Sequence, residues 1–350
     1  MIKAYKRCDL FLKLDAVNRL GDLDMKTKVG VIGLGFMGSA HARVYSNLKD
    51  CELVGVCDSN SDKRNIAKLY GCKFFENSED FFNEPLDAIS VCTPTAMHYD
   101  VVLEALDAGK HVLVEKPFAD SLKSGGEMSK KAAKLGRLMA VGYIERFNAA
   151  VRVLKDVVDC SQIFSTVSMR FGPFPPRTKY SGVFLDLACH EIDILNYLTQ
   201  TQPEVLYTQF SNKSDSDFED YAYISLKYGH IHSHIEASWL PNYKLRLINL
   251  YGNEKFYVLN YAQQKLKACR APPKAKIENG SWDDILWLSR HIEEEIPVSS
   301  TEPLLAELQC FIDSVKKNEI IDPLCNPSQA LQVLRVTDDA FSKAKLTKRA

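Results

Sequence analysis

A glycine-rich stretch near the start of the chain constrains the fold more than any other feature of the sequence. Val29 to Ile32 form an apolar run typical of a short buried strand, and the chain then passes through Gly33-x-Gly35-x-x-Gly38 into a stretch with helical apolar spacing. Gly33 suits a tight turn, Gly35 lets the backbone approach a pyrophosphate, and Gly38 lets helix and strand pack closely. The helix start offers free N–H groups to a phosphate. The pattern predicts a dinucleotide-binding unit.

A carboxylate follows where such a unit places its ribose contact. The strand predicted over residues 52–57 ends in Asp58, twenty residues after Gly38. NAD is the expected cofactor because Asp58 would repel a 2′-phosphate. NADP stays possible because Ser59, Lys63 and Arg64 follow at once and can hold a phosphate. The cofactor-binding residues expected from this region and its neighbours are Gly33, Gly35, Phe36, Met37, Gly38, Asp58, Ser59, Arg64, Thr93, Pro94, His98, Glu115 and Lys116.

Composition excludes several other classes of protein. The chain has 350 residues, 25% charged residues and a formal net charge of −1, which gives no electrostatic case for binding nucleic acid or a membrane surface. No apolar run is long enough to span a bilayer. The ten cysteines form no CxxC pair and no signal peptide is recognisable, so we expect reduced thiols and a cytoplasmic location.

The order of predicted elements indicates two domains after an N-terminal extension (1–25). Strand and helix alternate over 26–145, which predicts a Rossmann domain with a parallel sheet. Within it, Ser61 is expected to cap a helix to Tyr70, and Thr93 with Pro94 to begin a helix that runs through Ala108.

Residues 146–350 follow a different pattern. A strand at 163–171 is separated by a proline-rich loop and a helix from a series of closely spaced strands, which predicts a large, mainly antiparallel sheet. The predicted strands are 204–211, 219–227, 230–239, 244–251, 254–260 and 263–270, and helices at 302–317 and 328–345 finish the chain. The fold class is α/β: a Rossmann domain followed by an α+β domain with an open sheet.

Two stretches carry candidate chemistry. At about 100° per residue, Asp186, His190, Asp193 and Tyr197 share one stripe of a helix whose other faces are mostly apolar, so the stripe should face a cleft. An imidazole there can take a hydroxyl proton, and Asp186 can orient it. A satisfied core histidine is the competing interpretation. Lys116 follows the carboxyl end of a predicted strand, where open α/β sheets bind ligands.

Gly33-x-Gly35-x-x-Gly38, Glu115-Lys116-Pro117 and Asp186-x-x-x-His190, in this order, resemble the Gfo/Idh/MocA family (glucose–fructose oxidoreductase/inositol dehydrogenase) over residues 26–345. The resemblance implies that Lys116, Asp186 and His190 are the catalytic residues. The family's usual glycine before Gly182 is replaced by Ser181.

The resemblance also implies a reaction. Segments 141–148, 182–193 and 236–239 look most like UDP-N-acetylglucosamine 3-dehydrogenases, so the expected reaction is oxidation of a secondary hydroxyl of a sugar or nucleotide sugar, with the 3-hydroxyl of UDP-N-acetylglucosamine as the best match. A free polyol, inositol or aldose dehydrogenase and a non-catalytic cofactor-binding relative are the alternatives. The expected substrate-binding residues are Lys116, Tyr143, Arg146, Asn148, Arg177, Tyr180, Asp186 and His190. Arg146 and Asn148 are equally compatible with interdomain hydrogen bonds, and Arg177 and Tyr180 with an ordinary exposed loop.

Three histidines on one predicted strand, His230, His232 and His234, suggest a metal site. Side chains two residues apart on a strand point the same way and do not converge on one ion. We therefore predict no metal and assign these residues to a polar sheet surface or a subunit contact. The resemblance implies a homodimer or homotetramer joined through the large sheet.

Overall fold

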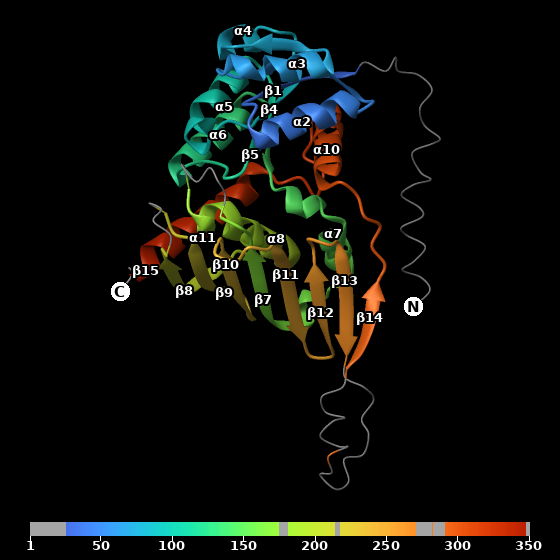
Figure 1. Cartoon of the computed structure of the whole chain (residues 1–350), viewed down its shortest axis with the longest axis vertical. Coiled ribbons are helices and arrows are strands. Elements are labelled where there is room, and N and C mark those ends of the chain that lie inside the picture. The colour runs from blue at the N-terminus through green and yellow to red at the C-terminus, as the bar shows by residue number, and fades with distance from the viewer. Residues whose placement is uncertain (1–25, 175–180, 214–217, 271–281, 283–290, 348–350) are drawn as a thin grey trace.

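The computed structural model describes residues 26–174, 181–213, 218–270, 282 and 291–347, and it divides into two layers around two sheets (Figure 1). The first sheet has six parallel strands within the described residues, in the order β3-β2-β1-β4-β5-β6. Its strands are β1 (Thr27–Ile32), β2 (Cys51–Cys57), β3 (Lys73–Phe75), β4 (Ala88–Val91), β5 (His111–Glu115) and β6 (Met139–Gly142). This strand order is that of a Rossmann fold, as predicted.

Helices flank this parallel sheet. They are α2 (Phe36–Asn47), α3 (Arg64–Tyr70), α4 (Ser78–Phe82), α5 (His98–Asp107) and α6 (Leu122–Lys134). Strands β1 and β4 are neighbours although two other strands lie between them in the sequence. Successive strands are therefore added on one side of β1 up to β3 and on its other side from β4 onward. Open sheets bind ligands at such a switch point, beyond the carboxyl ends of the strands.

Two predicted helix starts are wrong. The side chain of Asn60, not Ser61, accepts the capping hydrogen bond, from the backbone N–H of Asp62, because Ser61–Lys63 form a 3₁₀ turn before α3. Thr93 caps no helix either: Pro94 has extended backbone angles, and a 3₁₀ turn (Thr95–Met97) precedes α5. The residues after β4 are thus an open turn rather than the first turn of a helix.

The second sheet has nine strands among the described residues, in the order β14-β13-β12-β11-β7-β10-β9-β8-β15. They are β7 (Ile163–Phe171), β8 (Glu204–Ser211), β9 (Tyr221–Tyr228), β10 (Ile231–Ser238), β11 (Leu245–Gly252), β12 (Lys255–Asn260), β13 (Lys265–Arg270), β14 (Ile292–Ile296) and β15 (Lys345–Thr347). Most pairs are antiparallel, as predicted, but β7 with β10 and β8 with β15 are parallel. The sequence pattern missed β14 and β15.

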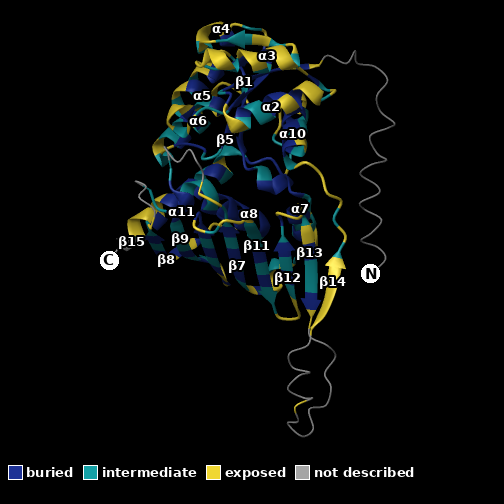
Figure 2. Ribbon diagram, viewed as in Figure 1, coloured by how far each residue is buried: buried dark blue, intermediate teal, exposed yellow. Residues whose placement is uncertain are grey.

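Helices α7 (Ala149–Val157), α8 (Cys189–Thr199) and α11 (Pro327–Lys343) lie between the large sheet and the Rossmann layer (Figure 1). Buried residues are concentrated on these helices and on the sheet strands beneath them (Figure 2). A π-helical turn (Phe184–Ala188) leads into α8, where a regular helix was expected. The predicted catalytic residues Asp186 and His190 thus lie on a largely buried element between the two sheets.

Helix α10 (Pro303–Lys317) returns to the Rossmann layer. Its Leu308 and Phe311 are fully buried in the same core as Val29 and Val31 of β1. The Rossmann layer therefore includes residues far beyond position 145. The domain boundary at 145 stays a prediction.

Candidate active site

The glycine loop has the geometry that its sequence predicts. Gly33 has a φ of +88°, and a Cβ there would lie 2.6 Å from the Thr93 nitrogen, so the turn after β1 requires glycine. A Cβ on Gly38 would lie 1.8 Å from the Gly33 carbonyl oxygen. A Cβ on Gly35 would meet nothing within 4 Å. The space above Gly35 is therefore open, which fits a ligand that needs close approach to the backbone.

Asp58 is fixed against this loop. Its Oδ2 accepts a hydrogen bond from the Leu34 N–H at 2.6 Å, and its Oδ1 accepts one from the Asn60 N–H at 2.9 Å. Each oxygen keeps a further lone pair, so the carboxylate can still accept from ribose hydroxyls. Phe36 is 87% exposed at the start of α2, and Met37 beside it is partly buried. The residues of this region that were predicted to bind the cofactor therefore lie together around the glycine loop.

Arg64 and Ser59 face solvent near this loop. The Arg64 guanidinium donates to Glu76 Oε1 at 2.8 Å and lies 4.9 Å over the Phe74 ring. Ser59 is exposed. Arg64 therefore already has a carboxylate partner, Glu76, in an exposed ion pair.

The turn after β4 lies across from the glycine loop. His98 is 1% exposed, and its two ring nitrogens face the carbonyl oxygens of Thr93 (2.9 Å) and Phe118 (3.3 Å). Burial lowers the pKa of His98, so the ring is neutral and its single N–H can donate to only one of these two carbonyl oxygens. Pro94 and the Thr93 backbone, rather than the His98 ring, form the surface of this turn. The Thr93 hydroxyl is buried with no hydrogen-bond partner in the described part of the chain.

Lys116 and Asp186 form an ion pair between the two domains. Lys116 Nζ donates to Asp186 Oδ1 and to the Asp186 backbone carbonyl, each at 2.9 Å. Burial raises the pKa of the Asp186 carboxyl, but the charge and hydrogen bond of Lys116, the charge of Arg170 and a hydrogen bond from Trp239 together hold that pKa below its usual value. Burial likewise opposes the Lys116 charge, and Asp186 is the largest of the influences that together raise the lysine pKa above its usual value. Both groups are therefore charged at neutral pH.

Glu115, the residue before Lys116, holds the Lys116 backbone in place. Its Oε1 lies 3.0 Å from His41 Nε2 on α2, and its Oε2 accepts a hydrogen bond from the Lys116 N–H at 3.1 Å. The His41 side chain is fully buried. Glu115 thus links Lys116 to the helix that follows the glycine loop, and its carboxylate points into the protein rather than into open space.

His190 lies at the start of α8 with only 5% of its surface exposed. Its Nδ1 is buried and has no hydrogen-bond partner among the described residues, and the Tyr143 ring packs edge-on at 6.4 Å. Burial lowers the pKa of His190 well below its usual value, and the cations Arg170, Lys116 and Arg246 lower it further. The imidazole is neutral at pH 7. The expected contact with Asp186 is not found in the described structure, because Asp186 pairs with Lys116.

A buried ionic cluster beneath His190 escaped the sequence analysis. Arg170 on β7 donates to Glu145 Oε1 through both terminal nitrogens at 3.1 Å, and through Nη1 to Glu191 at 3.3 Å and to the Tyr261 hydroxyl at 3.0 Å. The Tyr261 hydroxyl also donates to Glu191. Arg246 on β11 donates to Glu145 at 2.9 Å. The sequence carries one sign of this cluster, which is Arg170 itself. It is a charged residue on the buried face of a strand, and a buried charge needs partners.

With this geometry in view, comparison with known proteins identifies the family. The sequence model "Oxidoreductase family, NAD-binding Rossmann fold" matches residues 27–143, and "GFO/IDH/MocA C-terminal domain" matches residues 164–258. The chain belongs to the GFO/IDH/MocA oxidoreductase family.

Individual members of the family share the fold at low identity. UDP-N-acetylglucosamine 3-dehydrogenase of Acidithiobacillus ferrooxidans is 24% identical over 290 residues, 82% of this chain and 88% of the relative. Its solved structure has a TM-score of 0.81, covering 91% of this chain and 98% of that one at 22% identity. KijD10, a 3-ketoreductase from Actinomadura kijaniata solved with TDP-benzene and NADP, has a TM-score of 0.79 at 16% identity over 93% of this chain and all (100%) of that one.

A further relative is glucose-6-phosphate 3-dehydrogenase of Bacillus subtilis, 31% identical over 221 residues, 56% of this chain and 63% of the relative. The relatives and the family model make this GFO/IDH/MocA member an NAD(P)-dependent dehydrogenase that oxidises a sugar hydroxyl. The alternative of a non-catalytic relative is therefore not retained.

Arg146 and Asn148 hold the fold of this family member together. Arg146 is 1% exposed and makes a two-pronged ion pair with Asp193, at 2.8 and 2.7 Å, while its Nη1 donates to Gln329 at 2.8 Å. Asn148 caps α7 and donates to the Tyr261 carbonyl at 2.8 Å. All of these partners lie within residues 146–350, so the contacts are internal to the second domain and not interdomain hydrogen bonds as predicted. Asp193 therefore faces Arg146 rather than a cleft.

The remaining predicted residues divide into two groups. Arg177 and Tyr180 lie outside the described residues. The three histidines do not share one strand as predicted, because His230 lies in the exposed turn before β10. His232 on β10 is exposed, and His234 Nδ1 lies 2.9 Å from the Tyr223 hydroxyl. A different group, Cys269, His291 and Glu293, has its ligand atoms within 4.8 Å of one another. Glu293 Oε2 accepts a hydrogen bond from Lys267 Nζ (2.7 Å) and its Oε1 lies 2.9 Å from His291 Nε2, so Glu293 is already paired with a lysine and with the histidine of this group.

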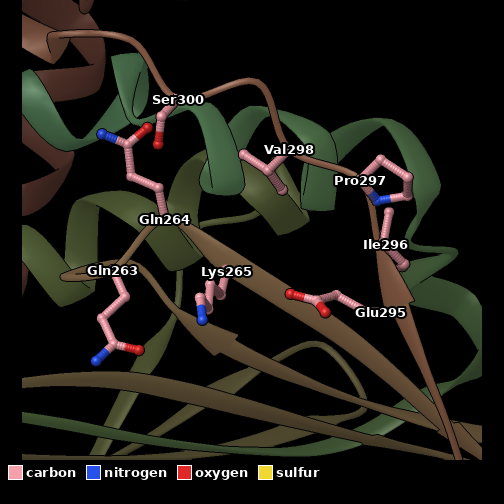
Figure 3. Close-up of a pocket in the computed structure, with 8 residues that line it drawn as sticks. All are labelled: Gln263, Gln264, Lys265, Glu295, Ile296, Pro297, Val298 and Ser300. Carbon is pink, nitrogen blue, oxygen red and sulfur yellow. The ribbon is translucent and has the colours of Figure 1, made fainter.

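A cavity of about 400 Å³ opens at the far edge of the large sheet (Figure 3). It is lined by residues 263–265, 295–298 and 300, and none of the predicted site residues reaches it. The candidate active site is therefore defined by its side-chain contacts and not by this cavity. Among the described residues, no helix is both long and apolar enough to cross a bilayer.

Proposed function

We propose that this enzyme oxidises the 3-hydroxyl of a UDP-N-acetylhexosamine to a 3-keto group, with Lys116 and His190 acting on the hydroxyl. The observation that carries the assignment of roles is the Lys116–Asp186 ion pair beside a buried, neutral His190. The substrate assignment is supported by the name of the Acidithiobacillus relative, which matches most of both chains.

The charges on these side chains define their roles. His190 is neutral because of its low pKa, so it can accept the proton that leaves the substrate hydroxyl. Lys116 has two hydrogen bonds to Asp186, and its third N–H is available to the substrate oxygen as negative charge develops there. Asp186 keeps the ammonium charged and in place. NAD held at the glycine loop would supply the acceptor for the hydride of the carbon that carries this hydroxyl, so that loss of the proton and of the hydride would together give the keto group.

The glycine loop supports the choice of cofactor position. The open space over Gly35 and the fixed carboxylate of Asp58 lie at one end of the parallel sheet, where the pyrophosphate and the ribose of NAD would be held. NAD is the proposed physiological cofactor, since Glu76 occupies Arg64.

A substrate panel tests the proposal. UDP-N-acetylglucosamine, UDP-glucose, glucose and myo-inositol are each supplied with NAD or NADP, and the reduced cofactor is followed by absorbance. The expected result is the highest kcat/KM for UDP-N-acetylglucosamine with NAD, lost in Lys116→Met. A higher kcat/KM for myo-inositol or glucose would instead make the enzyme a polyol or aldose dehydrogenase.

We also propose that two or four copies associate through the outer face of the large sheet. Residues on this face are only partly covered in one chain, and several are apolar: Val167, Met169, Phe171, Leu245 and Leu247. Such a face is suited to burial against a second copy. Sedimentation equilibrium at micromolar concentration should give a dimer or tetramer, and a monomer would contradict this proposal.

We propose the cytoplasm as the compartment. The nine described cysteines are free thiols, which supports this location.

A further inference from the structure

Two arginines lie side by side on the face of the large sheet that is turned toward His190. Arg170 of β7 and Arg246 of β11 are directly opposite in the antiparallel register of these strands. Both guanidinium groups donate to the same oxygen, Oε1 of Glu145, at 3.1 Å and 2.9 Å. One buried carboxylate therefore holds two cations in adjacent positions.

The two arginines differ in how many of their N–H donors are free to bind a ligand. The Arg170 side chain is 4% exposed and is engaged by Glu145, Glu191 and Tyr261. The Arg246 side chain is 31% exposed and makes a single hydrogen bond, through Nη1, within the part of the chain that the structure describes. Its Nε and Nη2 donors are thus available, while Glu145, itself only 5% exposed, fixes the direction of the group.

Arg246 is close enough to the reacting groups to affect them. Its charge contributes, with those of Arg170 and Lys116, to the field that keeps His190 neutral. Tyr143, which packs against the His190 ring, lies two residues from the Glu145 that anchors Arg246. These observations place Arg246 on the side of the large sheet where the sugar is proposed to react.

A planar guanidinium with free donors matches phosphate oxygens in a two-pronged arrangement. We propose that Arg246 binds a phosphate oxyanion carried by the sugar substrate and thereby selects anionic sugars over neutral ones. The oxyanion belongs to a nucleotide diphosphate or to a sugar phosphate. The proposal rests on the proposed function, because it takes the Lys116–Asp186–His190 site as the place where the sugar reacts.

The test compares Arg246→Met and Arg246→Lys with the wild type on three substrates: UDP-N-acetylglucosamine, glucose 6-phosphate and myo-inositol, each with NAD. Hydrogen bonds to charged groups typically contribute about 1.5–3 kcal/mol, so Arg246→Met should lower kcat/KM for the preferred anionic sugar by about 10- to 150-fold. The ratio of anionic to neutral kcat/KM should fall at least about tenfold with it. Arg246→Lys, which keeps the charge without the planar fork, should lose less. The anionic sugar that shows the larger loss identifies the source of the phosphate.

Arg270→Met is the matched control, because Arg270 is an exposed arginine at the end of β13. It should leave the ratio unchanged. An equal loss on anionic and neutral sugars in Arg246→Met, or no loss, would overturn the proposal. Thermal unfolding of each variant separates loss of selectivity from loss of fold, and Arg246→Lys gives the answer if Arg246→Met is unfolded.

Binding of UDP, measured by calorimetry in the presence of NADH, separates this proposal from the proposed function. If none of the sugars is oxidised but UDP affinity falls at least about tenfold in Arg246→Met, the anion site stands and the proposed function fails. If UDP-N-acetylglucosamine is oxidised equally well by wild type and Arg246→Met, and UDP affinity is unchanged, the proposed function stands and the role of Arg246 is refuted.

Discussion

Lys116 is held by Asp186 through both its side chain and its backbone, since Nζ donates to Oδ1 and to the carbonyl oxygen of the same residue at 2.9 Å. The carbonyl contact does not depend on the carboxylate. Removing the charge of Asp186 should therefore change the protonation of Lys116 without releasing its side chain. This relationship makes the pH dependence of the enzyme an informative measurement.

Asp186→Asn should lower the pH at which activity is lost on the alkaline side. Lys116 must be protonated to donate to the substrate oxygen, and Asp186 raises its pKa while burial lowers it. Without the carboxylate charge burial dominates, so the lysine loses its proton at lower pH. The measurement is the pH profile of kcat in both proteins. An alkaline limb at the same pH in Asp186→Asn would show that Lys116 does not titrate there.

His190 should remain a competent base below pH 6.5. Its folded-state pKa lies well below 6.5, so the neutral, proton-accepting form persists as the pH falls. Protonation of His190 is disfavoured in the folded state relative to the unfolded state. The contribution of His190 to the free energy of unfolding is therefore complete above about pH 6.5, and it is lost as the pH falls below that value toward the folded pKa. Titration of the His190 ring signals by NMR should give a pKa below 6.5, and a value at or above 6.5 would contradict it.

His190→Ala should lower kcat by about 10²- to 10⁴-fold, as expected for loss of a general base. NAD affinity should stay near that of the wild type, because His190 belongs to α8 of the second domain and is not part of the glycine loop. His232→Ala, an exposed histidine on the outer face of the sheet, is the control and should keep full activity. Near-full turnover in His190→Ala would remove this residue from the mechanism.

Gly35→Ala and Gly38→Ala should separate cofactor binding from folding. The Gly35 methyl would enter open space at a φ of −66°, so the variant should fold normally but bind NAD at least about tenfold more weakly. The Gly38 methyl would lie 1.8 Å from the Gly33 carbonyl oxygen, so that variant should be destabilised. Thermal unfolding and NAD titration of both variants test this. A Gly35→Ala variant with wild-type affinity would place the pyrophosphate elsewhere.

The sequence was most informative where local chemistry determines local structure. The glycine spacing predicted a turn that requires a φ of +88° at Gly33, and strict alternation predicted the bounds of β7 (Ile163–Phe171) without error. It failed where a partner comes from far along the chain. Asp193 was placed on a cleft-facing stripe with His190, but it pairs with Arg146, 47 residues away.

Two causes explain the other failures. The helical spacing assumed 100° per residue, but Phe184–Ala188 form a π-helical turn, so the stripe is not continuous through Asp186. The ionic cluster of Glu145, Arg170 and Arg246 joins a 3₁₀ turn and two strands that are adjacent only in the folded sheet. The spacing of residues along the sequence cannot predict such a contact.

The Arg146–Asp193 pair should be needed for stability. Both side chains are 1% exposed, so Asp193→Ala would leave a buried guanidinium without its counter-charge. Breaking a buried ion pair in this way costs about 3–5 kcal/mol. The free energy of unfolding in urea should fall by that amount, while Asp107→Ala, in an ion pair on the surface, should change it by about 1 kcal/mol or less. Comparable losses in the two variants would contradict the assigned role.

Asp58 should determine the preference for NAD over NADP. Its two oxygens accept hydrogen bonds from the N–H groups of Leu34 and Asn60, so the carboxylate cannot turn away from a 2′-phosphate without breaking both. At about 4 Å and an effective dielectric constant of about 20, the repulsion approaches ~4 kcal/mol before solvent reduces it. Even ~1.4 kcal/mol gives tenfold discrimination.

Asp58→Ala should therefore reduce the ratio of kcat/KM for NAD to that for NADP by at least about tenfold, mainly through KM. Arg64→Ala should change the ratio by less than about threefold, because Glu76 already pairs with that guanidinium at 2.8 Å and would itself repel a phosphate. The comparison needs both cofactors in all three proteins. If the wild type prefers NADP and Arg64→Ala abolishes the preference, Arg64 must leave Glu76 to bind the phosphate, and Asp58 is not the discriminating residue.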